Sequence, residues 1–142
     1  MTKNPEFTEK LRSSGLRPTK QRLKICEVLF NREKTFHFTI NDLAKNISEQ
    51  LSEKISLATV YNTVHAFKNE GYLKEISINS DKSYFDTNIT NHHHFFDEDT
   101  NELIDCDEEV IENLNIKKNI TGKKINSVEV LIKVASDNQN QN

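Results

Sequence analysis

Three consecutive histidines, His92 to His94, are the residues of this sequence best suited to chemistry. If they lie in a β-strand, His92 and His94 point to one face of the strand and His93 points to the other. Asp86 precedes them, and Asp105 follows on the neighbouring predicted strand. Two imidazoles and two carboxylates form a mixed nitrogen and oxygen ligand set, which suits divalent iron, manganese, zinc or cobalt. A triplet flanked by carboxylates therefore favours metal or cofactor binding.

A further ligand is available from the N-terminal half of the chain. His37 lies just ahead of a predicted helix, and we expect it to complete the set. Residues 97–112 contain nine acidic residues and no basic one, and most of these are expected to form a solvated face. Asp105 and Glu112 are the two that we separate from this background as candidate ligands. Cys26 and Cys106 are interpreted as small buried hydrophobic side chains rather than thiolate ligands.

Four helices and a β-hairpin are predicted to position the first half of these residues. The first helix covers residues 6–14 and is stopped by Gly15, and Thr19, Thr39 and Ser56 are the predicted N-caps of the other three. Gly71 ends the fourth helix. Apolar residues then alternate through 72–78, residues 79–81 form a turn, and residues 83–86 return as a partner strand. This order predicts a winged helix-turn-helix whose fourth helix reads DNA.

The second half of the chain reads as strand, strand, helix and strand. The strands are predicted at residues 92–97, 102–106 and 125–134, and the helix at residues 108–114. Fewer than 60 residues make a thin core, so we expect this half to form a homodimer. The predicted fold class is α+β, with a winged-helix DNA-binding domain at residues 1–88, a small α/β dimerisation and ligand-sensing domain at 89–135, and a disordered tail at 136–142.

The distribution of charged residues also separates the two predicted domains. Residues 1–84 contain 14 basic and 10 acidic residues, whereas residues 85–142 contain 5 basic and 12 acidic ones. A basic half joined to an acidic half suggests one surface for a polyanion and another for cations. The outward side chains of the fourth helix are short hydrogen-bonding groups and one aromatic ring, which favour DNA contact over simple solvation. The predicted DNA-binding residues are Arg17, Lys20, Arg22, Ser56, Thr59, Tyr61, Asn62 and Thr63.

Several function classes are excluded or made remote by composition. The chain has three glycines and no glycine-rich phosphate loop or nucleophile motif, so we do not expect an enzyme. A small non-haem metal enzyme and a haem or iron carrier without a DNA role stay as remote alternatives. No run approaches the roughly 20 apolar residues of a membrane span, and the N-terminus lacks the apolar stretch of a secretory signal. We therefore expect a cytoplasmic protein without a membrane partner.

Several motifs resemble those of the ferric uptake regulator family. The resemblance covers residues 7–134 and implies a dimeric, metal-responsive bacterial transcription factor. It implies a regulatory metal site at His37, Asp86, His92, His94 and Asp105, base contacts from Tyr61 and Asn62, and a minor-groove contact from Arg17. The motifs are Leu11-Arg12, Gly15-Leu16-Arg17-Pro18-Thr19, Gln21-Arg22, His37 with Thr39, Asp42-Leu43, the run SLATVYNT at residues 56–63, Phe85-Asp86 and His92-His93-His94.

The sequence departs from the family pattern at two places. Asp97 and Thr100 stand where most members carry a C-x-x-C pair, which excludes a cysteine-ligated structural zinc. The family's second histidine-carboxylate site is incomplete, because no histidine follows His94. The missing cysteines, the triplet and the run at residues 95–105 resemble the iron response regulator branch, in which haem binds partly through the triplet and switches the protein off. The residues for such a haem or second site are His92, His93, His94 and Glu112.

Together these observations predict an iron-responsive transcriptional regulator. It would bind an AT-rich inverted-repeat operator in double-stranded DNA as a homodimer. A divalent metal (iron, manganese or zinc) or haem would switch its DNA affinity. The alternative is a repressor of the ferric-uptake type, with iron or manganese as the co-repressor.

Overall fold

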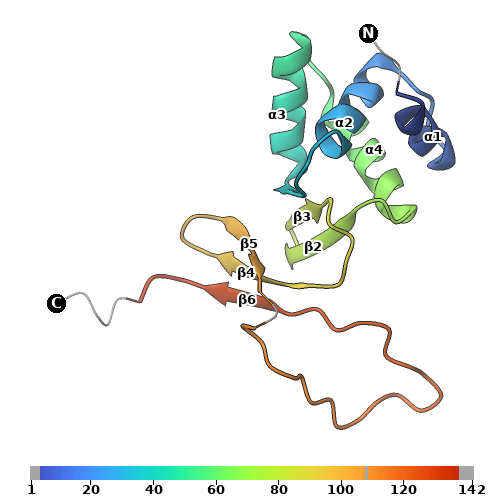
Figure 1. Ribbon diagram of the computed structural model, residues 1–142. Coiled ribbons are helices and arrows are strands. Elements are labelled where there is room, and N and C mark those ends of the chain that lie inside the picture. The colour runs from blue at the N-terminus through green and yellow to red at the C-terminus, as the bar shows by residue number, and fades with distance from the viewer. Residues whose placement is uncertain (1–3, 108, 138–142) are drawn as a thin grey trace. The chain divides into compact units, whose positions relative to one another are not determined.

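The computed structural model describes residues 4–107 and 109–137, and it divides the chain into two compact units (Figure 1). Unit 1 is Met1–Ile89 and unit 2 is Thr90–Asn142. Unit 1 contains four helices and a small sheet, and unit 2 contains a second small sheet. The predicted α+β fold class is confirmed. No helix among the described residues is long and apolar enough to cross a membrane.

The helices of unit 1 begin where the sequence places hydroxyl or amide caps. The side chain of Asn4 accepts a hydrogen bond at the start of α1, and Thr19, Thr39 and Ser56 do the same for the next three helices, as predicted. Gly15 and Gly71 follow the ends of the first and fourth helices with φ of 78° and 84°, a conformation that favours glycine. The helices are α1 (Pro5–Ser13), α2 (Lys20–Phe30), α3 (Ile40–Leu51) and α4 (Leu57–Asn69).

The core of unit 1 forms between one face of each helix and the sheet. Leu11 of α1, Ile25 of α2, Ile47 of α3 and Val64 of α4 are fully buried, and all belong to one hydrophobic cluster. Phe85 of the sheet is 2% exposed and joins the same cluster. This shared core holds α4 in a fixed position against the sheet.

The sheet of unit 1 contains one strand that the sequence did not predict. Strands β2 (Lys74–Asn79) and β3 (Lys82–Asp86) form the expected hairpin. The added strand is β1 (His37–Phe38), which pairs antiparallel with β3 and gives the order β1-β3-β2. Two residues are too few for a recognisable alternation, so the pairing had no signal in the sequence. Its register sets His37 opposite Asp86 and Phe38 opposite Phe85.

Unit 2 is a three-stranded sheet in the order β5-β4-β6. Strands β4 (His93–Asp97) and β5 (Glu102–Cys106) pair antiparallel around a turn at residues 98–101, close to their predicted positions. Strand β6 (Leu131–Val134) runs parallel to β4 on its other side. The buried apolar side chains of this sheet are Phe96, Leu103 and Cys106, so the core is thin.

The long connection between β5 and β6 differs from the prediction. The helix predicted at residues 108–114 is absent from the described residues 109–114, and residue 108 lies outside the described part. A seven-residue helix is unstable without a surface to cover its apolar face, and here Val110 and Leu114 are 50% and 46% exposed. The strand predicted at residues 125–134 forms only at Leu131–Val134, where β4 supplies backbone partners. Residues 138–142 of the predicted tail also lie outside the described part.

Candidate metal site and nucleic-acid interface

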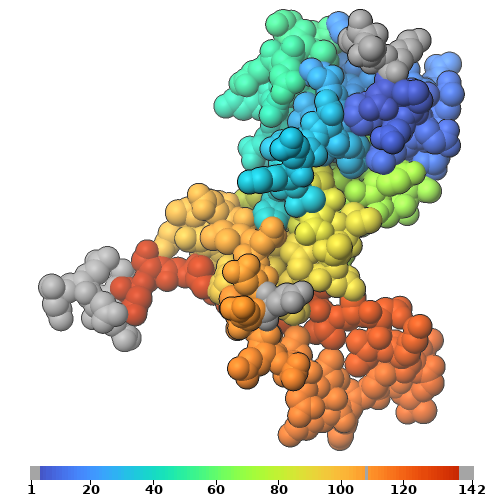
Figure 2. Space-filling model, viewed as in Figure 1, coloured from blue at the N-terminus to red at the C-terminus, as the bar shows by residue number. Residues whose placement is uncertain are grey.

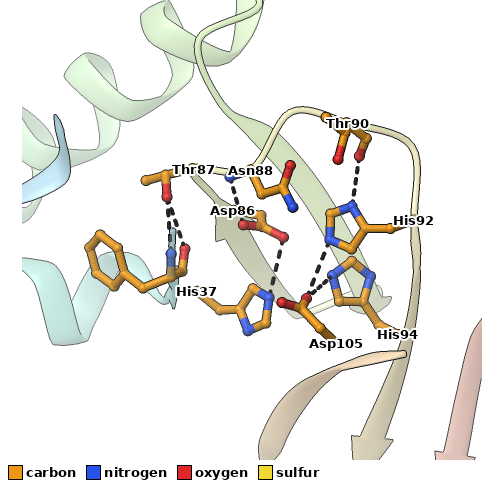
Figure 3. A network of polar contacts seen from close by, with 9 residues as sticks. His37, Asp86, Thr87, Asn88, Thr90, His92, His94 and Asp105 are labelled. Atoms are coloured by element: carbon orange, nitrogen blue, oxygen red, sulfur yellow. Dashed lines mark hydrogen bonds and ion pairs between the residues drawn. The ribbon is translucent and has the colours of Figure 1, made fainter. Parts of the chain in front are cut away.

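His37 and Asp86 form an ion pair at the end of the unit 1 sheet, here called the His37–Asp86 pair (Figure 3). The Nε2 atom of His37 is 3.2 Å from Oδ2 of Asp86. The other carboxylate oxygen, Oδ1, accepts the backbone N–H of Asn88 at 2.8 Å. Asp86 is 1% exposed, so its charge is removed from water and depends on these partners.

The outer end of β1 is tied to the chain after β3 by hydrogen bonds between Phe36 and Thr87. The backbone N–H of Phe36 donates to Oγ1 of Thr87 at 3.0 Å, and the N–H of Thr87 donates to the carbonyl of Phe36 at 3.2 Å. These bonds extend the β1–β3 ladder by one step beyond His37 and Asp86. The pair therefore lies between two fixed rungs, which limits how its side chains can move.

A second group of candidate ligands lies within unit 2, here called the His92–His94–Asp105 cluster (Figure 3). Strand pairing sets His94 opposite Asp105. The Nε2 atoms of His92 and His94 are each 3.3 Å from Oδ1 of Asp105. The imidazole centroids are 4.3 Å apart, and His94 is 5% exposed. The prediction that these two histidines share one face agrees with this geometry.

The hydrogen bonding of His92 prepares one ring nitrogen for a metal. Its Nδ1 is 2.6 Å from the carbonyl oxygen of Thr90. A carbonyl can only accept, so Nδ1 carries the proton and, in the neutral ring, Nε2 keeps its lone pair. That lone pair is directed to the same place as the Asp105 carboxylate. A backbone carbonyl that fixes the tautomer in this way is a common partner of metal-bound histidine.

The donor set of the cluster fits a divalent cation. Its three candidate ligand atoms lie within 4.8 Å of one another. Two imidazole nitrogens and a carboxylate oxygen suit iron, manganese or zinc, and they supply no thiolate. The His37–Asp86 pair offers one more nitrogen and one more oxygen of the same kind.

The other candidate second-site residues are placed differently. Nδ1 of His93 accepts the backbone N–H of Val130 at 2.9 Å, so one ring nitrogen braces the approach to β6. Glu112 is exposed in the segment between β5 and β6 that has no regular structure. Within the described part of unit 2, neither residue joins the cluster of His92, His94 and Asp105.

The candidate nucleic-acid face lies on α4 of unit 1. Tyr61 is 52% exposed and Asn62 is exposed beside it. The hydroxyl of Ser56 accepts the backbone N–H of Thr59 at 3.1 Å and lies 2.9 Å from Oγ1 of Thr59, so both side chains complete the helix N-terminus. The assignment of Thr63 to this face is wrong. It is fully buried and its hydroxyl donates to the Thr59 carbonyl at 2.7 Å.

Two further residues of α4, Leu57 and His65, lie at or beside this face. The apolar spacing of Leu57 with Val60, Val64 and Phe67 predicts that Leu57 faces the core, yet it is 54% exposed one turn before Tyr61. The two side chains together give the face an apolar component, which suits the methyl group of thymine. The ring of His65 packs on Tyr61 with centroids 4.1 Å apart. The i, i+4 spacing of Tyr61 and His65 brings these two rings together on the helix surface.

The three predicted basic contacts also differ among themselves. Arg17 and Lys20 are exposed, and Lys20 lies 3.8 Å from Glu53. Arg22 instead donates from Nη1 to the carbonyl of Arg17 at 3.1 Å, and its Nε is buried without a partner among the described residues. Arg22 therefore braces the turn that presents Arg17.

Both cysteines are buried, as expected. Burial raises the pKa of Cys26 from its ordinary value of 9.0 to about 12, although the charge of Lys10 lowers it in part. A thiol with such a pKa stays protonated at neutral pH and is a poor nucleophile and metal ligand.

Comparisons with known proteins agree with this architecture. The sequence model of the ferric uptake regulator family matches residues 13–134. The peroxide-responsive repressor PerR of Staphylococcus aureus strain Mu50 is 33% identical over 100 residues, which are 70% of this chain but only 66% of that protein, just under two thirds of its length. The ferric uptake regulator of Vibrio cholerae is similar in structure, with a TM-score of 0.65 and 26% identity over 91% of this chain and 98% of that one. A Pseudomonas aeruginosa ferric uptake regulator with manganese shares the fold at a TM-score of 0.63, with 22% identity over 92% and 97% of the two chains.

Proposed function

Because the chain belongs to the ferric uptake regulator family, we propose that it is a metal-dependent transcriptional repressor that binds double-stranded DNA as a homodimer. The observation that carries the proposal is the orientation of the His92–His94–Asp105 cluster. Its nitrogen and oxygen ligands converge, and the Thr90 carbonyl holds His92 in the tautomer that a metal requires. Such a convergence of lone pairs is stable when a cation lies between them.

We further propose that the His37–Asp86 pair and the His92–His94–Asp105 cluster bind one divalent cation together. The chain supports this, because only five residues separate Asp86 from His92. When bound, the cation supplies positive charge to two carboxylates and accepts the lone pairs of three imidazoles. Ligands from both units then restrict the angle between them, and this angle sets the spacing of the two α4 helices in a dimer. Metal affinity and operator affinity are thereby linked.

For DNA, α4 would enter the major groove of each half of an AT-rich inverted repeat. Exposed Leu57 and Tyr61 supply apolar contact to thymine methyl groups, and Asn62 supplies hydrogen bonds to base edges. Arg17 and Lys20 add the contacts to phosphates or the minor groove that depend on salt. A regulator of chromosomal genes works in the cytoplasm, which is where we place it.

The homodimer is supported by the surface of unit 2. Apolar side chains stay exposed along the segment that joins β5 to β6, which is the orange part of the space-filling view (Figure 2). Exposed apolar side chains that recur along one segment mark an interaction site, and a second copy of the chain covers them in our proposal. The exposed residues are Val110, Leu114, Ile116, Ile120, Ile125 and Val128.

A DNA-binding titration of metal-stripped protein tests the function. The probe is an AT-rich inverted repeat at fixed salt, alone, with manganese as an air-stable substitute for ferrous iron, and with haem. We expect tight binding only with manganese, because His93 is engaged by the Val130 backbone and the remaining ligands suit a small cation. Binding without added metal that is lost on adding haem would instead assign the protein to the iron response branch.

Variants on α4 and in the His92–His94–Asp105 cluster test whether α4 binds the operator and whether the cluster senses the metal. Tyr61→Ala and Asn62→Ala should each weaken operator binding about 5- to 150-fold, the range for one good base contact, with manganese binding unchanged. Asn69→Ala, at the exposed end of the same helix, is the matched control. The double variant His92→Ala with His94→Ala should keep the fold but lose the response to manganese. Full response in that double variant would place the sensor elsewhere.

Peroxide is a second candidate signal, because the similar Staphylococcus aureus protein is a peroxide-responsive repressor. Hydrogen peroxide added to the iron-loaded and manganese-loaded proteins on the operator distinguishes a peroxide signal from a signal of metal supply. Release of DNA from the iron-loaded protein alone would add peroxide sensing to the proposed function. Retention of DNA by both would restrict the signal to metal supply.

A further inference from the structure

A continuous row of aromatic rings crosses unit 1 from α4 to the β1–β3 ladder. The ring of Tyr61 packs on His65 with centroids 4.1 Å apart and an angle of 35° between the ring planes. His65 meets Phe85 of β3 edge to face, at 5.4 Å and 81°. Phe85 stacks on Phe38 of β1 at 5.8 Å and 26°. Four side chains from three elements are thus in sequential contact.

The two ends of this row lie in different surroundings. Tyr61 is 52% exposed on the candidate nucleic-acid face, whereas Phe85 and Phe38 are 2% and 4% exposed in the core. Close-packed rings cannot shift independently, because a gap of a fraction of an ångström already loses much of the contact energy. A displacement at the buried end is therefore passed to the next ring of the row.

The buried end of the row is adjacent to the candidate metal ligands. Phe38 and Phe85 face each other across the β1–β3 ladder, and the neighbouring rung is formed by His37 and Asp86. Each aromatic residue is thus joined by one peptide bond to one member of the His37–Asp86 pair. Any change in the separation of His37 and Asp86 alters the rung that holds the two rings.

We propose that His65 is a positioning residue that couples the His37–Asp86 pair to Tyr61. The inference rests on the proposed function and assigns part of its regulation to a side chain that contacts neither DNA nor metal. In an α-helix the bond from Cα to Cβ tilts toward the N-terminus, so the side chain at i+4 lies against the side chain at i. His65 therefore supports the Tyr61 ring from one side while Phe85 contacts His65 from the other.

A second connection between α4 and the sheet provides an internal comparison. Lys68 Nζ lies 2.7 Å from Oε1 of Glu75 on β2. It joins the same helix to the same sheet, but β2 lies on the far side of β3 from β1 and carries neither candidate ligand. Lys68→Met breaks this connection without removing any ring of the row, although Glu75 itself lies opposite Phe85 in the sheet register.

The test compares operator affinity with and without manganese in the full-length protein. The ratio of the two affinities measures the coupling. His65→Ala should reduce this ratio about 2- to 30-fold, the range for substitutions that alter coupling without touching a ligand, and should leave manganese affinity unchanged. His65→Phe keeps a ring between Tyr61 and Phe85 and should preserve the ratio. Lys68→Met should lower operator affinity both with and without manganese, and it should therefore also preserve the ratio.

A spectroscopic readout follows Tyr61 without DNA. Fluorotyrosine placed at position 61 should change its ¹⁹F chemical shift when zinc, which is diamagnetic, is added to the wild-type protein. The change should be lost in His65→Ala and kept in His65→Phe. An unchanged affinity ratio in His65→Ala together with a retained shift would overturn the coupling and leave the proposed function standing. A wild-type protein whose DNA affinity ignores manganese would overturn both.

Discussion

Asp86 lies directly opposite His37 across the β1–β3 ladder, and the carboxylate oxygen Oδ2 is 3.2 Å from the imidazole Nε2. A two-residue strand is enough to create this relationship, because the hydrogen bonds between Phe36 and Thr87 hold its outer end. The buried carboxylate already has partners on both oxygens, so little rearrangement is needed for it to bind a cation.

Asp86→Asn is expected to weaken manganese binding strongly while it preserves the sheet. Asparagine keeps the oxygen that accepts the N–H of Asn88, but it removes the negative charge that faces His37. Loss of outer-shell partners costs about 10- to 100-fold in metal affinity, and loss of a ligand should cost at least as much. Isothermal titration with manganese measures this.

Asp81→Asn is the control for Asp86→Asn, because it removes an exposed carboxylate from the turn between β2 and β3. It should bind manganese as the wild type does. If Asp86→Asn also binds manganese with wild-type affinity, the His37–Asp86 pair is structural and the proposed single site is wrong.

The sequence predicted the helices of unit 1 well because their signals are local. Hydroxyl caps at Thr19, Thr39 and Ser56 begin the predicted helices, and glycines with positive φ follow α1 and α4. The same local pattern had enough information to place Thr63 in the core, because it lies three residues after Val60 on the same face. Its polarity led to the wrong assignment.

The elements that the sequence did not predict depend on partners distant in the chain. Strand β1 exists only through its pairing with β3. In the described residues 109–114, Val110 and Leu114 of the apolar face predicted for a helix are exposed, so periodicity alone was not enough. Of the candidate ligands, the shared face of His92 and His94 follows from strand alternation, whereas the register of His37 with Asp86 does not follow from any local pattern.

Arg17→Ala and Lys20→Ala are expected to change the salt dependence of DNA binding. Each phosphate contact contributes about 0.9 to the slope of log affinity against log salt, so each variant should reduce the slope by about that amount. Arg22→Ala should behave differently, because its guanidinium donates to the Arg17 carbonyl. We expect Arg22→Ala to lower thermal stability in addition to changing DNA binding. Operator affinity measured between about 50 and 200 mM salt gives the slopes, and unchanged slopes would remove Arg17 and Lys20 from the interface.

The stability of unit 1 should fall at alkaline pH because of Cys26. Burial raises the pKa of this thiol from 9.0 to about 12 in the folded protein. Between these values the unfolded chain loses the proton and the folded chain keeps it, so the free energy of unfolding falls as pH rises. At about pH 10.5 the loss reaches about 2 kcal/mol, since each pH unit contributes up to about 1.4 kcal/mol.

Urea unfolding of the wild type and of Cys26→Ala at about pH 8 and pH 10.5 isolates this contribution from other titrating groups. Cys26→Ala is expected to be the less stable protein at the lower pH, because it leaves a small cavity. Its additional loss at the higher pH should be about 2 kcal/mol smaller than that of the wild type. Equal losses would mean that the thiol is solvated in the folded state.

The segment between β5 and β6 should control self-association. Ile116 and Ile120 are 48% and 73% exposed within one chain, and burial of such side chains against a second copy would stabilise a dimer. The double variant Ile116→Asp with Ile120→Asp puts charges into that interface and should convert the protein to a monomer in sedimentation velocity. Operator binding should weaken with it, because a monomer contacts only half of an inverted repeat.

A matched double variant, Asn115→Asp with Thr121→Asp, adds the same charge at exposed polar positions of the segment. It should sediment as the wild type does, which separates the loss of apolar contact from the effect of charge. If both double variants stay dimeric, the second copy associates through another surface. If both become monomeric, charge repulsion from the acidic C-terminal half rather than the two isoleucines determines assembly.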